Sequence, residues 1–240
     1  MANRPYNHWM NDRHNGELSR KEGLVEVSVF LFLILPSMLL SFFVIKQGNL
    51  SFILVAFAAI LRDLALVSLI LFFIWHNREP IDGLGWKSRN AGKEIVLGMG
   101  LYIPFFVFVG LFESALKMAG FSAPSTPLPS FMTARWLGES LLAVVLVAVV
   151  ALTEETIFRG YLILRLKAIT SSPTVAALLS AAIFSLGHGY EGSAGVLTVG
   201  VMGFIFAFIY LWRQSLLAPI VMHFLQDFIG VVLLPWLGKG

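Results

Sequence analysis

Long apolar runs recur along most of the chain after residue 23, and short polar stretches separate them. Most of these runs are long enough for a helix to cross a hydrocarbon core of about 30 Å. The composition agrees, since 58% of the residues are hydrophobic, 13% are charged and the mean hydropathy is +0.82. Soluble domains fall well outside this range. The sequence therefore predicts an all-α fold, a polytopic transmembrane helical bundle.

The apolar runs predict about seven membrane spans. They lie near residues 24–45, 50–75, 95–112, 135–167, 174–186, 194–212 and 216–237. Basic residues gather in the two polar stretches 1–23 and 76–94, which the positive-inside rule assigns to the cytoplasm. We expect an integral, multi-pass protein of a membrane such as the bacterial inner membrane, with a cytoplasmic N-terminus.

This pattern divides the chain into four parts. They are a polar cytoplasmic arm (1–23), three N-terminal transmembrane helices (24–118), a Pro-rich outer loop (119–136) and a core of four helices (137–237). The prolines at 124, 127 and 129 exclude a continuous helix through the outer loop.

Composition also excludes several kinds of function. The chain has no cysteine, which excludes a disulfide framework, thiol catalysis and a Cys-ligated metal. The net charge of +3 is modest, and the basic residues sit mostly between apolar segments. We therefore expect the lipid bilayer as a partner and no nucleic acid. His8 and His14 lie in the polar arm without a ligand cluster, so we interpret both as solvated.

Charged side chains cluster at one point inside the apolar sequence. Glu154, Glu155 and Arg159 follow directly on the apolar run 137–152. A charged side chain at membrane depth costs about 2.5–3.5 kcal/mol on insertion scales. The cluster marks either the place where a helix leaves the membrane or a polar site inside the bundle.

The next turn in the sequence favours the polar site. Residues 170–173 read Thr-Ser-Ser-Pro, with Ser172 as N-cap and Pro173 in the first helical position of the next helix. Glu155 lies 15 residues before Thr170 and His188 lies 18 after it. At a rise of about 1.5 Å per residue these separations are roughly 22 and 27 Å, so the two side chains reach similar depth on antiparallel helices.

The spacing within the motif separates its two glutamates. In an α-helix Glu154 shares a face with Phe158, and Glu155 shares another face with Arg159. One glutamate can therefore face a cavity while its neighbour pairs with Arg159 at i,i+4.

Two more polar pairs interrupt apolar segments. His223 and Asp227 are also spaced i,i+4 and point the same way from the last helix. Arg62 and Asp63 interrupt the second span, and we interpret them as a structural pair that faces the bundle.

The residue types leave three kinds of chemistry open. Two histidines and one or two carboxylates can bind a divalent metal and activate water. A glutamate and a histidine can also activate water directly, while a second histidine stabilises an oxyanion. Buried glutamate and histidine also serve as proton relays in transporters.

Other classes of intramembrane protease lack their motifs here. The sequence contains neither His-Glu-x-x-His nor Gly-x-Gly-Asp. Ser193 could suggest a serine nucleophile, but it lies in a short Gly-Ser-Ala-Gly stretch, and we interpret it as a turn residue.

The polar motifs together resemble a known family. Glu154-Glu155-x-x-x-Arg159, then Phe184-x-x-x-His188, then His223-x-x-x-Asp227 is similar to the three-motif signature of the CPBP family. These are the CAAX-protease and bacteriocin-processing (Abi-like) intramembrane proteases, typified by the Ras-and-a-factor converting enzyme. The helices that carry the motifs cover roughly residues 137–237, and the first three spans are only compatible with the family.

The resemblance implies catalytic roles for four residues. Glu154 would be the base that activates water, and His188 would assist it. His223 and Asp227 would stabilise the tetrahedral intermediate or serve as metal ligands. Many members have Asn where this chain has Asp227, and a carboxylate accepts hydrogen bonds but does not donate unless protonated.

The resemblance also implies supporting residues and a cofactor. Glu155 and Arg159 would form the ion pair that holds the helix, and Phe184 would pack beside the site. The family is named for metalloproteases, although a metal-free glutamate mechanism also fits it. If a divalent metal such as zinc is used, its ligands would be Glu154, His188, His223 and Asp227.

We therefore expect an intramembrane endopeptidase that cuts a membrane-associated or lipidated protein or peptide. Two alternatives remain. One is a non-catalytic membrane scaffold or bacteriocin-immunity protein of the same fold, and the other is a proton-coupled transporter. The sequence identifies neither the substrate nor the oligomeric state.

Overall fold

The computed structural model describes residues 20–44, 51–87, 90–123 and 133–237, and these contain helices and turns but no strand. The α-helices are α1 (Arg20–Val44), α2 (Phe52–His76), α3 (Ala91–Met118), α4 (Leu137–Glu154), α5 (Ile163–Thr170), α6 (Pro173–Leu186), α7 (Gly192–Arg213), α8 (Leu217–Asp227) and α9 (Leu234–Leu237). Two π-helices, η3 (Glu155–Leu162) and η5 (Phe228–Leu233), and two 3₁₀ turns, η1 (Ile81–Leu84) and η4 (Gly189–Glu191), complete them.

The polytopic helical bundle is confirmed, but the count of about seven spans is not supported. Within the described residues, five helical segments are long and apolar enough to cross a membrane: Phe52–His76, Ala91–Met118, Leu137–Thr170, Gly189–Arg213 and Leu217–Leu237. Helix α6 has 14 residues, short of the roughly 20 that a span needs. Helix α1 is not among the five. The predictions for His8, His14 and the outer-loop residues 124–132 concern residues outside the described part.

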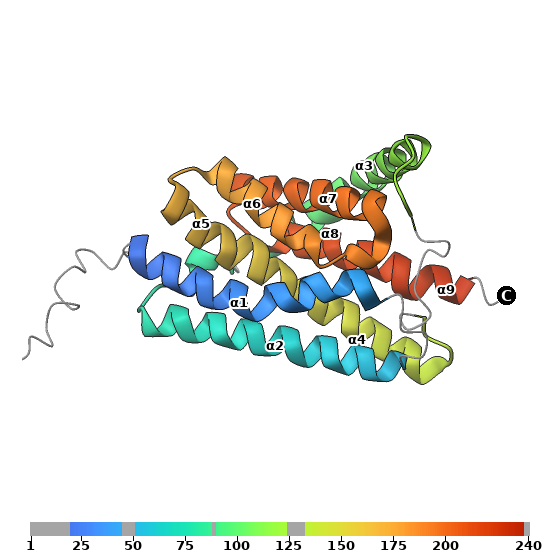
Figure 1. Cartoon of the computed structure of the whole chain (residues 1–240), viewed down its shortest axis with the longest axis horizontal. Coiled ribbons are helices and arrows are strands. Elements are labelled where there is room, and N and C mark those ends of the chain that lie inside the picture. Colours follow the sequence, from blue (N-terminus) through green and yellow to red (C-terminus); the bar gives the residue numbers. More distant parts are fainter. Residues whose placement is uncertain (1–19, 45–50, 88–89, 124–132, 238–240) are drawn as a thin grey trace, which may run out of the picture.

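The segment Leu137–Thr170 runs through the middle of the bundle (Figure 1). Half of its most apolar stretch is buried, against 17% for α2 and 22% for α3. Large apolar side chains point outward from α2 and α3, as lipid-facing helices require. The helix that carries the charged motif is therefore a central one.

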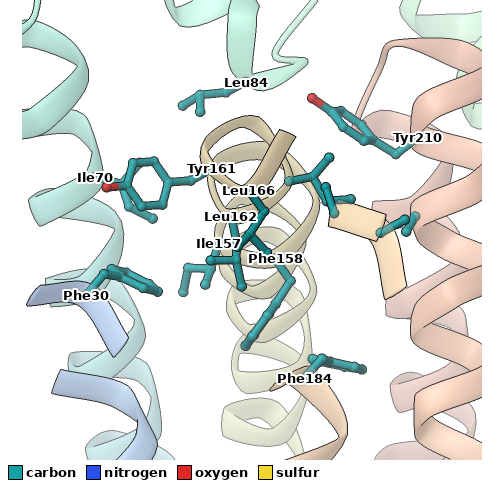
Figure 2. Close-up of a cluster of buried hydrophobic side chains, with 14 of the residues drawn as sticks. Phe30, Ile70, Leu84, Ile157, Phe158, Tyr161, Leu162, Leu166, Phe184 and Tyr210 are labelled. Atoms are coloured by element: carbon teal, nitrogen blue, oxygen red, sulfur yellow. The ribbon is translucent and has the colours of Figure 1, made fainter. Parts of the chain in front are cut away.

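Side chains of this central helix form the largest buried apolar cluster. In Figure 2, Ile157, Phe158 and Leu162 occupy the middle of the cluster, with Phe30 on one side and Tyr210 on the other. The motif residues that are not charged thus anchor the helix in the protein core.

Gly160, the last residue of the motif, allows a close approach to this helix. A Cβ atom at Gly160 would lie 2.9 Å from the carbonyl oxygen of Leu84, closer than such contacts occur in proteins. Glycine is needed here because the short turn η1 packs its backbone directly on the central helix.

Arg165 ties the far end of the central helix to two other elements. Its Nη1 and Nη2 donate to Glu79 at 3.0 and 2.8 Å, and its Nε donates to Glu26 of α1 at 2.9 Å. The hydroxyl of Tyr161 also donates to Glu26, at 3.0 Å. Because Arg165 is only 3% exposed, two carboxylates are needed to satisfy its fork of donors.

The predicted hairpin between the motif helix and the next helix is confirmed. Ser171 turns the chain with a φ of 56°, and the Ser172 hydroxyl accepts from the Val175 N–H at 3.3 Å. Pro173 occupies the first turn of α6, as the sequence predicted. Helix α6 packs back against α5 and η3, and lies beside α7 (Figure 1).

Candidate active site

The backbone changes from α-helix to π-helix at the glutamate pair. Helix α4 ends at Glu154, and the π-helix η3 begins at Glu155. The sequence suggested an α-helix that continues through the motif, so this detail was not predicted. π-Helical turns are rare, and they occur frequently at functional sites.

A buried hydroxyl from α6 supports this unusual backbone. The Ser180 Oγ–H donates to the Phe158 carbonyl oxygen at 2.7 Å, and Ser180 is only 1% exposed. Buried carbonyls need a partner, and this bond supplies one across the hairpin. A second π-helix, η5, begins directly after Asp227, so two candidate site residues stand at such transitions.

Glu155 and Arg159 form the ion pair that their spacing predicted. Arg159 Nη1 lies 2.9 Å from Glu155 Oε1, and the two side chains are 1% and 0% exposed. Two opposite charges without solvent stabilise the fold only when further groups satisfy them. Whether this ion pair stabilises the fold therefore depends on the groups that surround each charge.

His223 shares the same glutamate oxygen. Its Nδ1 lies 2.8 Å from Glu155 Oε1, while its Nε2 lies 3.4 Å from Asp227 Oδ2 and 3.7 Å from Glu154 Oε2. Since each ring nitrogen faces a carboxylate oxygen, the form that fits carries a proton on both nitrogens. The structure thus brings Glu154, Glu155, His223 and Asp227 together.

His188 lies at the edge of this group. Its ring centroid is 5.0 Å from that of Phe184, and its Nδ1 is 3.3 Å from the Phe184 carbonyl oxygen. His188 and Glu154 interact electrostatically. No hydrogen bond joins them among the described residues, so Glu154 contacts His223 more closely than the assisting histidine that the sequence pointed to.

Phe184 lies where the resemblance placed it, beside the site. Its ring packs edge-on against Phe158, with 5.0 Å between centroids, and against His223, with 6.0 Å between centroids. The Arg159 guanidinium carbon lies 4.5 Å from the Phe184 ring centroid.

The Arg62–Asp63 pair of α2 lies beside the site, but only Asp63 faces the bundle interior as predicted, because the Arg62 side chain is 49% exposed. Arg62 donates through Nε to Asp63 at 2.8 Å, and Asp63 is 1% exposed. The Thr153 hydroxyl, one residue before Glu154, donates to Asp63 at 3.4 Å. Arg62 also interacts electrostatically with Glu154. The second span therefore contributes charge to the surroundings of the glutamate pair.

The donor atoms do not form a metal centre as they are arranged. Within the described residues, no three His, Asp or Glu side chains are grouped so that they could hold a metal ion. A catalytic zinc ion needs three protein ligands. His223 Nδ1 and Glu155 Oε1 are engaged with each other, and Arg159 neutralises that glutamate. The described structure therefore groups no three of the predicted ligands Glu154, His188, His223 and Asp227 around one point, and the metal stays a prediction.

Gly203 and Phe206 are parts of the site that the sequence did not predict. The Gly203 carbonyl accepts from Arg159 Nη2 at 3.2 Å, and the Phe206 ring centroid lies 5.4 Å from the Arg159 guanidinium carbon. Both lie in the apolar helix α7, where Gly203 reads as a small packing residue. Their contacts with Arg159 alone distinguish them from the other apolar residues of α7, and the spacing of residues in the sequence does not predict those contacts.

Ser193 serves a structural purpose. Its hydroxyl accepts from the Ser122 N–H at 2.9 Å, at the first turn of α7. Ser193 is therefore the second residue of α7 and not the loop turn residue that the sequence suggested, and the glutamate–histidine group is left as the candidate site.

The fold and the site together define a polytopic helical membrane protein with a buried acid–histidine centre. Residues 136–229 match the family model described as Rce1-like, Type II CAAX prenyl endopeptidase Rce1-like. This segment contains all three motifs, and the match supports the predicted resemblance to the CPBP and CAAX-protease family. Neither the curated proteins nor the solved structures compared with the chain gave a match. The family supports an intramembrane protease of the CAAX type.

Removing one partner of the central ion pair should destabilise the protein strongly. We expect Glu155→Gln or Arg159→Met to cost about 3–5 kcal/mol, because each removes one partner of a buried ion pair. The double variant should cost less than the sum of the two, since it removes both charges of the pair. Unfolding of the purified protein in detergent measures all three.

The outer pair Glu113–Lys117 is the matched control, because it has the same i,i+4 spacing at 36% and 48% side-chain exposure. Glu113→Gln should change stability by less than about 1 kcal/mol. Single variants of the buried pair that cost no more than Glu113→Gln would contradict this account of the site.

Proposed function

We propose that this protein is an intramembrane endopeptidase that hydrolyses a peptide bond in a membrane-associated or lipidated protein or peptide. One observation carries the proposal: the carboxylates of Glu154, Glu155 and Asp227 converge on His223 inside the segment that matches the CAAX-protease family. Carboxylates and a histidine in contact, away from bulk water, can donate and accept the protons that general acid–base hydrolysis requires.

In this mechanism Glu154 takes a proton from water, and the resulting hydroxide attacks the peptide carbonyl carbon. Glu154 suits this step because its side chain is 16% exposed and is not engaged in the Glu155–Arg159 pair. Its electrostatic interaction with His188 supports the assisting role of that histidine. The proton on Glu154 then passes to the leaving nitrogen as the C–N bond breaks.

His223 stabilises the oxyanion of the tetrahedral intermediate through its Nε2–H. The Nδ1–H of His223 is hydrogen-bonded to Glu155, so only its Nε2–H can contact a substrate. Asp227 lies 3.4 Å from that nitrogen and, as a carboxylate, accepts from it. Asp227 therefore orients His223 and does not itself donate to the oxyanion.

The substrate and the topology remain predictions. The description of the matched family model favours a prenylated CAAX peptide as the substrate. A role in the maturation of bacteriocins or other peptides would instead favour an unlipidated substrate. The count of about seven spans, the cytoplasmic N-terminus and the bacterial membrane also stay predictions.

Glu154→Gln and His188→Ala should abolish cleavage. In proteoliposomes, we expect the rate to fall by at least about 100-fold, because each change removes a proton-transfer group. Two reporters should be used, a peptide with a prenylated CAAX end and an unlipidated peptide with an apolar anchor. Glu113→Gln, on the outer end of α3, is the control and should cleave normally.

Two results would point to the alternatives. A biological activity that persists in both variants would favour a scaffold or immunity protein. A proton flux across the vesicle membrane that depends on Glu154 would favour a transporter.

Substitutions at Asp227 test its orienting role. Asp227→Asn keeps an acceptor oxygen for His223 Nε2–H, so we expect activity to stay within about threefold of the original. Asp227→Leu removes the acceptor, and we expect a loss of about 10-fold to 100-fold. Equal losses in both variants would show that the negative charge itself is required.

Chelation tests the metal alternative. Because no three donor side chains among the described residues are grouped to hold an ion, we expect the cleavage rate to be unchanged by a strong chelator, and purified active protein to contain less than one metal per chain. Inhibition by the chelator that zinc reverses would contradict the side-chain mechanism and establish a metalloprotease.

A further inference from the structure

Arg159 is a buried cation with fewer acceptors than donors. A guanidinium carries five N–H groups. Glu155 Oε1 and the Gly203 carbonyl take two of its contacts, at 2.9 and 3.2 Å. Its Nη1 meets Glu155 as an ion pair but makes no hydrogen bond of good geometry within the described residues. Something else must therefore stabilise and hold this charge.

Two aromatic rings from neighbouring helices supply that stabilisation. The Arg159 guanidinium carbon lies 4.5 Å from the ring centroid of Phe184 on α6 and 5.4 Å from that of Phe206 on α7. Both distances are within the range of cation–π attraction, which strengthens when the cation is desolvated. Arg159 is 1% exposed, so both contacts are dry. We call Phe184 and Phe206 the aromatic clamp.

The backbone of α7 closes the remaining space beside the guanidinium. A Cβ atom at Gly203 would lie 3.1 Å from Phe184 Cδ1 and 3.3 Å from Arg159 Nη2, closer than most such contacts. Gly203 thus admits the guanidinium against the helix backbone, and the clamp leaves little room for another position of Arg159.

The same two rings also border His223. The ring centroid of His223 lies 5.9 Å from that of Phe206 and 6.0 Å from that of Phe184. The clamp therefore contacts both groups that bind Glu155 Oε1. If either ring were lost, the guanidinium and the imidazole could both shift, and the glutamate between them would lose its fixed geometry.

We propose that Phe206 is a positioning residue for His223. It acts with Phe184 by confining the guanidinium, which holds Glu155 and thereby keeps the imidazole Nδ1–H bonded and its Nε2 edge toward the substrate. Phe206 lies outside all three sequence motifs. Its effect on turnover rests on the proposed protease function, but its effect on the histidine does not.

A neighbouring phenylalanine provides a matched control. Phe105 of α3 packs on Phe206 with 5.0 Å between ring centroids, and both are buried in the same apolar cluster, at 5% and 1% exposure. No contact of Phe105 with Arg159 or His223 is found among the described residues. Replacing either ring with leucine removes the same atoms from the same core, but only Phe206→Leu opens the clamp.

The first measurement is kinetic. In the proteoliposome assay we expect Phe206→Leu to lower kcat about tenfold and to leave KM within about twofold, since it disturbs the transition state more than substrate binding. Phe105→Leu should leave both constants within about twofold. Equal effects of the two substitutions on kcat would overturn the positioning role.

The second measurement is spectroscopic and needs no substrate. With ¹⁵N-labelled histidine, the imidazole shifts of His223 report which ring nitrogens carry a proton. We expect Phe206→Leu to change this signal and Phe105→Leu to preserve it. An unchanged His223 signal in Phe206→Leu would overturn the proposal whether or not the protein is a protease.

The two measurements distinguish failure of the proposed function from failure of a variant to fold. If the wild-type protein cleaves no reporter, the proposed function fails while the histidine signal still decides the role of the clamp. If Phe206→Leu does not fold, Phe206→Met keeps most of the side-chain volume without the ring, and the same two measurements apply to it.

Discussion

A single oxygen atom, Oε1 of Glu155, connects the parts of this site. It lies 2.9 Å from Arg159 and 2.8 Å from His223, and so joins the central helix to α8 in the interior of the bundle. Burying these charges is costly unless each is paired and held in good geometry. The aromatic rings around Arg159 and the carboxylates around His223 are the groups that make the arrangement tolerable. Removing any one of these groups leaves a buried charge with fewer partners, which lowers the stability of the fold.

This connection divides the work of two adjacent glutamates. Glu155 is fully buried and tied to the fold, whereas Glu154 keeps 16% of its side chain exposed beside His223. The change from α-helix to π-helix falls between them, and the Ser180 hydroxyl supports the altered backbone. A glutamate fixed by the fold, Glu155, can therefore be adjacent to Glu154, which is accessible to water and substrate. Such rigidity is what a hydrolytic site needs, because its groups must be in place before charge develops.

Much of this could be predicted from the sequence. Hydropathy predicted the bundle, the Ser-Ser-Pro turn predicted the hairpin, and i,i+4 spacing predicted the Glu155–Arg159 pair. The count of about seven spans was not supported, because hydropathy does not fix helix length, and the apolar helix α6 has only 14 residues. Phe206 could not be found, because it is one apolar residue among many in α7 and matters only through its neighbours. The π-helix was also missed, since its hydrogen bonding depends on tertiary partners such as Ser180.

The central claim, that this acid–histidine group hydrolyses peptide bonds, is tested most directly by product analysis. Purified protein in proteoliposomes would be given a membrane-anchored reporter peptide in H₂¹⁸O, and the fragments analysed by mass spectrometry. The account predicts one cut whose new C-terminal carboxyl carries one ¹⁸O atom, with no such product from Glu154→Gln. The same labelled product from Glu154→Gln at an undiminished rate would contradict it.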